Sequence, residues 1–207
     1  MEQLTVRWHG HACFSLTCRD FTVVLDPYED HYVPGFPPLR LTGDLVLCSH
    51  QHNDHNAAEI VTLRTGRPNP FRITKIPTFH DPEGGRLRGR TPSICWRWAS
   101  CGWPISGTWA VPSLPRKRQS SRAWTRPWCP WGAFTPLVPR RPRPCWTIFG
   151  PRSFCPCTTG WAPWALPAVG QVEDFLSLVE NYVYYPTDTL SLDEGTKPQI
   201  AVLHCSV

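Results

Sequence analysis

Acidic residues are missing from a long internal part of this chain, because none occurs between Glu83 and Glu173. Histidine is missing over almost the same interval, between His80 and His204. No apolar run approaches the length of a membrane span, and the N-terminus lacks the basic-then-apolar pattern of a signal peptide. Without a signal, the ten cysteines do not indicate a secreted disulfide framework. We therefore expect a cytoplasmic protein with no membrane segment.

Length and composition predict one domain with three unlike parts. The chain of 207 residues is long enough to bury a real core, and we expect residues 1–207 to form a single domain. Residues 1–90 and 172–207 have ordinary composition. Residues 91–171 hold ten of the eleven tryptophans and most of the prolines, and neither strand nor helix periodicity persists there.

The two ordinary parts carry patterns typical of an α/β protein. Leu4, Val6 and Trp8 alternate with polar residues, as in a half-buried strand. The other expected elements are strands at Phe21–Leu25, Asp44–Ser49, Phe71–Ile76 and Ile200–Leu203, a helix within Asn56–Leu63, and an amphipathic helix marked by Val172, Phe175, Leu176 and Val179.

The strongest chemical signal is the run His50-Gln51-His52-Asn53-Asp54-His55, which directly follows the expected strand Asp44–Ser49. Three imidazoles and a carboxylate crowded at a strand end are costly unless a cation holds them. Zinc binds neutral imidazole and carboxylate oxygen at about 2.0–2.2 Å. Manganese and iron accept the same ligands, so the sequence predicts one or two divalent metal ions of open identity.

This motif resembles the His-x-His-x-Asp-His signature of the metallo-β-lactamase superfamily of metal-dependent hydrolases. The neighbouring segments Trp8–Phe14, Val24–Tyr28 and Pro77–Asp81 are similar to the branch of ascorbate-phosphate lactonase-like proteins. The resemblance runs from about Leu4 to Gly89. It implies a four-layer αββα sandwich and hydrolysis of a small-molecule ester, lactone or phosphoester by a metal-bound hydroxide.

The resemblance also implies roles for individual residues. His50, His52 and His80 would bind a first metal, whereas Asp54 and His55 would bind a second. Asp54 would in addition orient the nucleophile, which makes it the candidate catalytic residue. His11 follows a strand and a glycine, and it either faces substrate or anchors its loop. Asp26 ends a strand, where it either accepts a hydrogen bond from a ligand histidine or stabilises a turn. His204 is expected to be structural.

Residues 91–171 have the composition that GC-rich coding DNA gives when it is read out of phase. Read one base upstream, Trp103–Ala110 can encode a string with Gly-Asp, and Cys155–Trp161 can encode a string with Met-His-Tyr. Both resemble later motifs of the family, which supply an Asp that bridges two metals and a His that binds the second. We therefore predict a frameshift near Arg86–Thr91 that is undone near Gly170–Gln171. The intervening part would then lack native structure, and activity would be impaired.

A different class of function is compatible with the same residues. Net charge is +5, and the basic run Arg116-Lys117-Arg118 lies near tryptophans, as in a nucleic-acid-binding protein. The alternative is therefore a non-catalytic metal- or nucleic-acid-binding protein with a genuine basic middle. The frameshift explains this run better, so a nucleic-acid partner is not expected. Oligomeric state is open.

Overall fold

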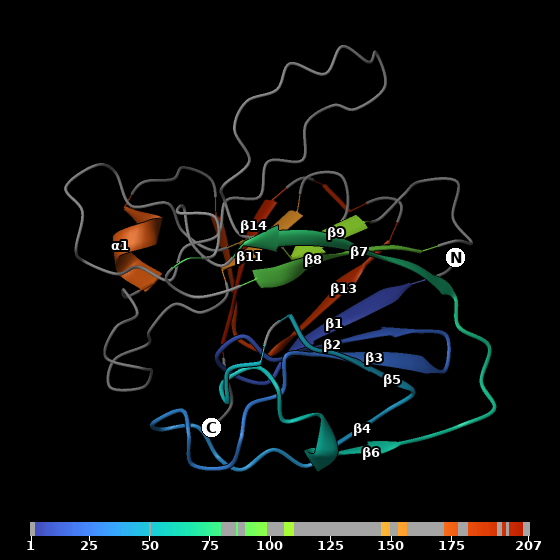
Figure 1. Ribbon diagram of the computed structural model, residues 1–207. Helices are drawn as coiled ribbons and strands as arrows, with labels where there is room; N and C mark the ends of the chain where they lie inside the picture. Colours follow the sequence, from blue (N-terminus) through green and yellow to red (C-terminus); the bar gives the residue numbers. More distant parts are fainter. Residues whose placement is uncertain are drawn as a thin grey trace.

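The computed structural model describes most of the N-terminal part of the chain and shorter segments beyond it (Figure 1). The described residues are 3–49, 51–79, 86, 90–98, 106–109, 146–149, 153–156, 172–177, 182–193, 196–197 and 199–204. Most of these segments are strands, and they form four sheets of five, four, three and two strands.

The largest sheet has five strands in the order β13-β1-β2-β3-β5. These strands are β1 (Leu4–Trp8), β2 (Phe14–Cys18), β3 (Phe21–Leu25), β5 (Leu45–Leu47) and β13 (Thr189–Leu192). All neighbours are antiparallel except β3 and β5, which are parallel. The predicted strands at β1 and β3 are confirmed, and the third is shorter than predicted.

Three smaller sheets complete the described strands. One pairs β4 (Leu41–Gly43) with β6 (Val61–Leu63), and one has the order β7 (Phe71–Phe79), β8 (Arg90–Trp98), β9 (Ser106–Trp109). The last has the order β10 (Trp146–Phe149), β11 (Ser153–Pro156), β14 (Gln199–Leu203), β12 (Tyr182–Tyr185). The strands expected at Phe71–Ile76 and Ile200–Leu203 are therefore confirmed, within β7 and β14.

The main core joins the five-stranded sheet to residues of β6, β7, β14 and the loop between β3 and β4. Leu4, Val6 and Trp8 point inward from β1, as their alternation with polar residues requires. Phe71 of β7 and Leu203 of β14 belong to the same buried cluster. Burying apolar surface from several sheets in one cluster is what fixes their mutual packing.

The register of the large sheet brings three loops to one edge. Trp8 of β1 pairs with Phe14 of β2, which pairs with Leu25 of β3, and Leu25 pairs with Leu47 of β5. The last residues of β1, β3 and β5 therefore lie in one row. The loops that follow these strands begin side by side at that edge, and they carry the candidate site residues.

The predicted helix within Asn56–Leu63 is wrong. The segment instead forms a single 3-10 turn, η1 (Ala58–Ile60), followed by strand β6. The backbone N–H of Ala57 donates to Pro27 O at 2.9 Å, and β6 pairs in parallel with β4. Tertiary hydrogen bonds thus override the weak local helix preference.

The described segments of residues 91–171 form strands, and the expectation that the interval lacks native structure stays a prediction. Strands β8 to β11 all fall in or at the edge of this interval, and β8 pairs with β7 over nine positions. Pro92 lies in β8 opposite Pro77, outside the stretch Ile94–Arg97 that pairs with β9. Much of the interval lies outside the described residues, so the frameshift hypothesis stays a prediction.

Helices are few in the part of the chain that the structure describes. Apart from η1, it contains α1 (Val172–Leu176), which confirms the start of the predicted C-terminal helix; Val179 lies outside the described residues. The two helical layers of the expected αββα sandwich therefore stay a prediction. Among the described helices, none is long and apolar enough to cross a membrane.

Asp44, between β4 and β5, joins three segments through its carboxylate. It accepts hydrogen bonds from the backbone N–H of Thr22 at 2.8 Å and from the guanidinium groups of Arg64 and Arg67. Burial by itself would raise the pKa of Asp44, but the Thr22 N–H and the Arg64 guanidinium more than offset it and hold the pKa below its ordinary value. The ionised carboxylate is therefore the form that stabilises the fold.

Replacing Asp44 with Asn should lower the free energy of unfolding by about 1–3 kcal/mol at neutral pH, because charge-assisted hydrogen bonds are lost. Since the pKa is depressed in the folded state, this contribution is present above the ordinary value of 3.8 and is lost as pH falls below it. Urea unfolding at several pH values measures the difference between variant and wild type. A difference that persists unchanged at low pH would contradict the assignment.

Candidate metal centre

The loop after β1 is held in an unusual backbone conformation that places His11. Gly10 and His11 have φ values of 99° and 47°, both in the left-handed region. A Cβ atom on Gly10 would lie 2.4 Å from Cδ1 of Phe36, so only glycine fits there. Trp8 Nε1 donates to His11 O at 2.9 Å, and Tyr28 Oη donates to His9 O at 3.1 Å. These contacts fix His11 in a buried position.

The loop after β3 starts with Asp26, which is fully buried and has a φ of 43°. Its carboxylate accepts hydrogen bonds from the backbone N–H and the hydroxyl of Ser49, both at 2.6 Å. It also accepts a hydrogen bond from His55 Nδ1 at 2.7 Å. Asp26 therefore orients His55, which is one of the two alternatives that the sequence left open.

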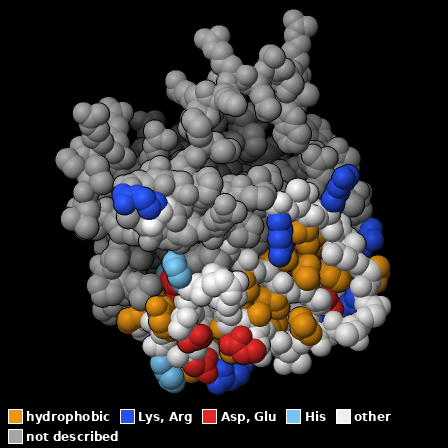
Figure 2. All heavy atoms as spheres, viewed as in Figure 1, with side chains coloured by type: hydrophobic (Ala, Val, Ile, Leu, Met, Phe, Trp, Pro, Cys, Tyr) orange, Lys and Arg blue, Asp and Glu red, His pale blue; other side chains and the backbone are white. Residues whose placement is uncertain are grey.

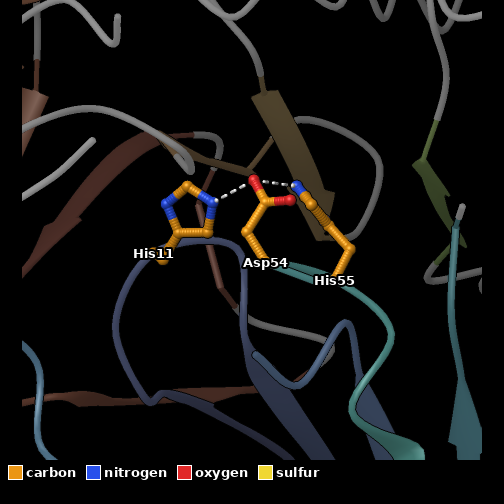
Figure 3. A group of neighbouring side chains, drawn as sticks. All are labelled: His11, Asp54 and His55. Atoms are coloured by element: carbon orange, nitrogen blue, oxygen red, sulfur yellow. Dashed lines mark hydrogen bonds and ion pairs between the residues drawn. The ribbon is translucent and has the colours of Figure 1, made fainter. Parts of the chain in front are cut away.

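The loop after β5 brings Asp54 and His55 against His11 (Figure 3). Asp54 Oδ2 accepts from His11 Nε2 at 3.1 Å and lies 3.3 Å from His55 Nε2. One ligand atom from each of these three residues lies within 4.8 Å of the others. Two imidazole nitrogens and one carboxylate oxygen thus converge on one position, and we call these three residues the metal cluster.

Charges in the metal cluster are strongly coupled. Burial lowers the pKa of His11, and the hydrogen bond to Asp54 offsets this only in part. Burial would raise the pKa of Asp54, but hydrogen bonds from His11 and His55 hold it well below its ordinary value. Burial would lower the pKa of His55, yet the carboxylates of Asp26 and Asp54 raise it to about 9. The carboxylate of Asp54 therefore remains ionised between the two imidazoles, and this is the form that binds a cation.

Acidic side chains also gather near this edge of the molecule. Figure 2 shows Asp and Glu low on the described part of the face, over the loops coloured blue and teal in Figure 1. Cys48 does not lie in the group of ligand atoms formed by His11, Asp54 and His55. Burial and the nearby Asp26 and Glu59 raise the pKa of its thiol to about 12.

The structure brings together only part of the predicted ligand set. Asp54 and His55 lie in the metal cluster, whereas His52 is exposed and lies outside it. His50 and His80 lie outside the described residues, so their roles as ligands stay predictions. His204 is exposed after β14, where its backbone N–H donates to Thr187 O at 3.0 Å.

Sequence reasoning missed the position of His11 as a partner of Asp54. One signal in the sequence was available. His11 lies in a loop that directly follows a strand, as Asp26 and Asp54 do. Sequence reasoning also missed Ser49, Tyr28 and Phe36, which hold the two loops through hydrogen bonds and packing. Nothing in the local pattern of these three residues distinguishes them from ordinary loop residues.

Comparison with known families gives a match that covers this site. Residues 5–106 match the family model described as Beta-lactamase superfamily domain. The match spans just under half of the chain, and over this part the chain is similar to the metallo-β-lactamase superfamily. The match begins in β1 and ends in β9, so it includes all three loops of the metal cluster.

Curated proteins match this chain over short stretches. A UPF0173 metal-dependent hydrolase of Thermoplasma acidophilum is 46% identical over 56 residues, which cover 27% of this chain and 25% of that protein. A UPF0173 metal-dependent hydrolase of Thermoplasma volcanium is 37% identical over 77 residues, which cover 33% and 32% of the two chains. The matched stretch thus spans a third or less of each curated relative.

A solved structure extends the comparison to the whole fold. The structure of a proposed Zn-dependent hydrolase of the metallo-β-lactamase superfamily from Thermotoga maritima superposes with a TM-score of 0.60. The match covers 97% of this chain and 98% of that chain at 20% sequence identity. At this identity the comparison supports the fold, and it leaves the chemistry to the residues of the site.

Gly10 provides a test of how tightly the His11 loop is held. Gly10→Ala should destabilise the protein by about 1–2 kcal/mol through its positive φ and by about 1–3 kcal/mol more through the clash with Phe36. Gly66→Ala is the matched control, because Gly66 has a φ of 83° but no atom within 4 Å of an added Cβ. Chemical denaturation compares the two variants. Equal destabilisation would show that Phe36 does not constrain the loop.

Proposed function

We propose that this protein is a metal-dependent hydrolase that binds a divalent ion through His11, Asp54 and His55. The observation that carries the proposal is the convergence of two imidazole nitrogens and one carboxylate oxygen within 4.8 Å. Catalytic zinc sites characteristically have three protein ligands of this kind and one open position. Manganese or iron suits the same donors, and zinc is the proposed ion.

The surroundings of the metal cluster fit such an ion. His55 uses Nδ1 for Asp26, so Nε2 is directed toward Asp54 and the proposed ion. A carboxylate behind a ligand histidine fixes the ring and raises its basicity, which is a common support in metal sites. His11 is buried at 1% exposure and directs Nε2 to the same carboxylate oxygen. His55 is therefore oriented by Asp26 from outside the cluster, and His11 by its hydrogen bond to Asp54.

A divalent ion at this position would lower the pKa of a bound water and polarise an oxygen of the substrate. The chain's own residues would supply the positioning. Asp54 is ionised and can accept a hydrogen bond from the attacking water, which suits its predicted catalytic role. Asp26 keeps His55 in one orientation through the reaction. The substrate class remains an ester, lactone or phosphoester small molecule.

The names of the similar proteins are consistent with this proposal. The UPF0173 proteins are named metal-dependent hydrolases, and the Thermotoga maritima protein is a proposed Zn-dependent hydrolase. We extend the proposal to a second metal, which His50, His52 and His80 would help to bind. We also propose that the chain forms a single domain with the four-layer αββα arrangement, and that it is located in the cytoplasm. A frameshift over residues 91–171 would remove further ligands and impair turnover. The rival nucleic-acid run Arg116–Arg118 lies outside the described residues.

The metal cluster predicts which substitutions weaken metal binding. His55→Ala and Asp54→Ala should each weaken the affinity for zinc about 10-fold or more, because each removes one of three donors. Competition with a chromophoric chelator measures the affinity, and elemental analysis gives the metal content. His31→Asn is the matched control, since His31 is exposed and also has a positive φ, 64°. Unchanged affinity in both cluster variants would overturn the proposal.

The frameshift hypothesis predicts a difference in turnover between two forms of the chain. A version with residues 91–171 read one base upstream should hydrolyse generic lactones or phosphodiesters in the presence of zinc, and the present chain should be slower or inactive. Adding chelator should remove the activity, and Asp54→Ala in the restored chain should abolish it. Equal rates in both forms would contradict the frameshift. Salt-sensitive nucleic-acid binding by the present chain would instead favour the rival function.

A further inference from the structure

Ser49 lies between the end of β5 and the histidine motif, and its side chain is buried. The backbone N–H of Asp26 donates to Leu47 O at 3.0 Å, which continues the parallel pairing of β3 with β5 beyond the last strand residues. Ser49 follows Leu47 by two positions, so this pairing carries it to the carboxylate of Asp26. Ser49 has 1% exposure and Asp26 has 0%, so solvent does not compete for the contacts between them.

Two donors share one oxygen of the Asp26 carboxylate. Ser49 Oγ lies 2.6 Å from Asp26 Oδ2, and His55 Nδ1 lies 2.7 Å from the same atom. The backbone N–H of Ser49 donates to the other oxygen, Oδ1, at 2.6 Å. Charge-assisted hydrogen bonds measure about 2.5–2.7 Å for O–H donors and about 2.7–2.9 Å for N–H donors. Both contacts to Oδ2 fall in these ranges, which indicates an ionised carboxylate that accepts from both groups.

The accepting role of Oδ2 decides which nitrogen of His55 is left for a metal ion. An ionised carboxylate has no proton to give, so the proton of this contact belongs to His55 Nδ1. A neutral imidazole with its proton on Nδ1 has its lone pair on Nε2. Nε2 lies 3.3 Å from Asp54 Oδ2, within the metal cluster. The form of His55 that binds an ion there therefore depends on Asp26 being an acceptor.

The hydroxyl of Ser49 favours the accepting state of Asp26. A buried carboxylate is costly to keep ionised unless hydrogen bonds replace its hydration. The hydroxyl supplies one of these bonds to the same oxygen that His55 contacts, so it also restrains the acceptor of Nδ1. The backbone next to His55 is held separately, because Ala57 N donates to Pro27 O at 2.9 Å. Loss of the hydroxyl should therefore disturb the imidazole and leave the chain around it in place.

We propose that Ser49 is a positioning residue of the metal centre, whose hydroxyl keeps Asp26 an acceptor for His55 Nδ1 and thereby presents His55 Nε2 to the ion. This inference rests on the proposed function, because it concerns the affinity of the same site. Ser49 acts through Asp26 and contacts neither the ion nor the substrate. A residue with a hydroxyl is therefore required at this position, and an apolar residue of similar size is not equivalent.

The zinc affinity of the full chain, measured by competition with a chromophoric chelator, tests this role. Ser49→Ala should weaken zinc binding about 3- to 10-fold, below the roughly 10- to 100-fold loss for direct partners of ligand histidines. Ser49→Thr keeps a hydroxyl and should restore the affinity. Ser15→Ala is the matched control, because Ser15 is also buried and its hydroxyl lies 2.9 Å from His9 Nε2, outside the cluster. An affinity that is equal in wild type and Ser49→Ala would overturn the inference.

The hydrogen bond itself is tested without metal, by proton NMR of the full chain with isotope-labelled histidine. The Nδ1 proton of His55 should exchange with water severalfold faster in Ser49→Ala than in wild type, because its acceptor is less firmly held. Ser15→Ala should exchange as the wild type does. Equal exchange in wild type and Ser49→Ala would overturn the inference. A wild type that binds no zinc but shows this difference would remove the proposed function and leave the link from Ser49 to His55.

A double-mutant cycle tests whether the hydroxyl acts through Asp26. Asp26→Asn keeps the size of the side chain, and Asn tolerates the positive φ of 43° at this position. This variant should lose zinc affinity about 10-fold or more. Ser49→Ala should then cause no further loss in the Asp26→Asn background, because the carboxylate on which the hydroxyl acts is gone. Losses that simply add would show a different route and overturn the inference.

Discussion

The buried carboxylate of Asp26 is the interaction on which the site depends. It directly follows β3, has no solvent exposure, and accepts three hydrogen bonds, two from Ser49 and one from His55. A carboxylate buried in such a place is costly unless its oxygens are hydrogen-bonded. Ser49 directly precedes the histidine motif and His55 ends it. Their hydrogen bonds to Asp26 therefore hold both ends of the motif at the end of β3. The backbone strain at Asp26 is a further sign that packing determines this geometry.

The local pattern of apolar residues was sufficient to predict the strands whose structure depends on burial alone. Leu4, Val6 and Trp8 alternate because one face of β1 meets the core, and the run Phe21–Leu25 is apolar because β3 is covered. The motif His52–His55 was readable because metal ligands have few substitutes. Within this motif, however, the structure places Asp54 and His55 in the cluster and leaves His52 exposed, and spacing along the chain cannot distinguish these outcomes.

The parts that could not be predicted depend on contacts between distant segments. His11 joins Asp54 across 43 positions, and Asn56–Leu63 forms a turn and a strand because Pro27 and β4 supply the partners. Strand β8 accommodates Pro92 because β9 pairs only with Ile94–Arg97, which leaves Pro92 with a strand neighbour on one side. In each case the deciding partner lies far away in the sequence. The resemblance to a family predicted a metal site built from histidine and aspartate. The structure adds His11 to Asp54 and His55 and leaves His52 outside the cluster.

Phe36 and Tyr28 belong to the loop between β3 and β4, yet both touch the backbone of the turn before His11. Much of that loop faces solvent, including Tyr32 at 43% exposure. A change that displaces the ring of Phe36 or Tyr28 would therefore also remove a contact that holds the backbone before His11. The shape of the cluster thus depends on residues of the β3–β4 loop that supply none of its ligand atoms.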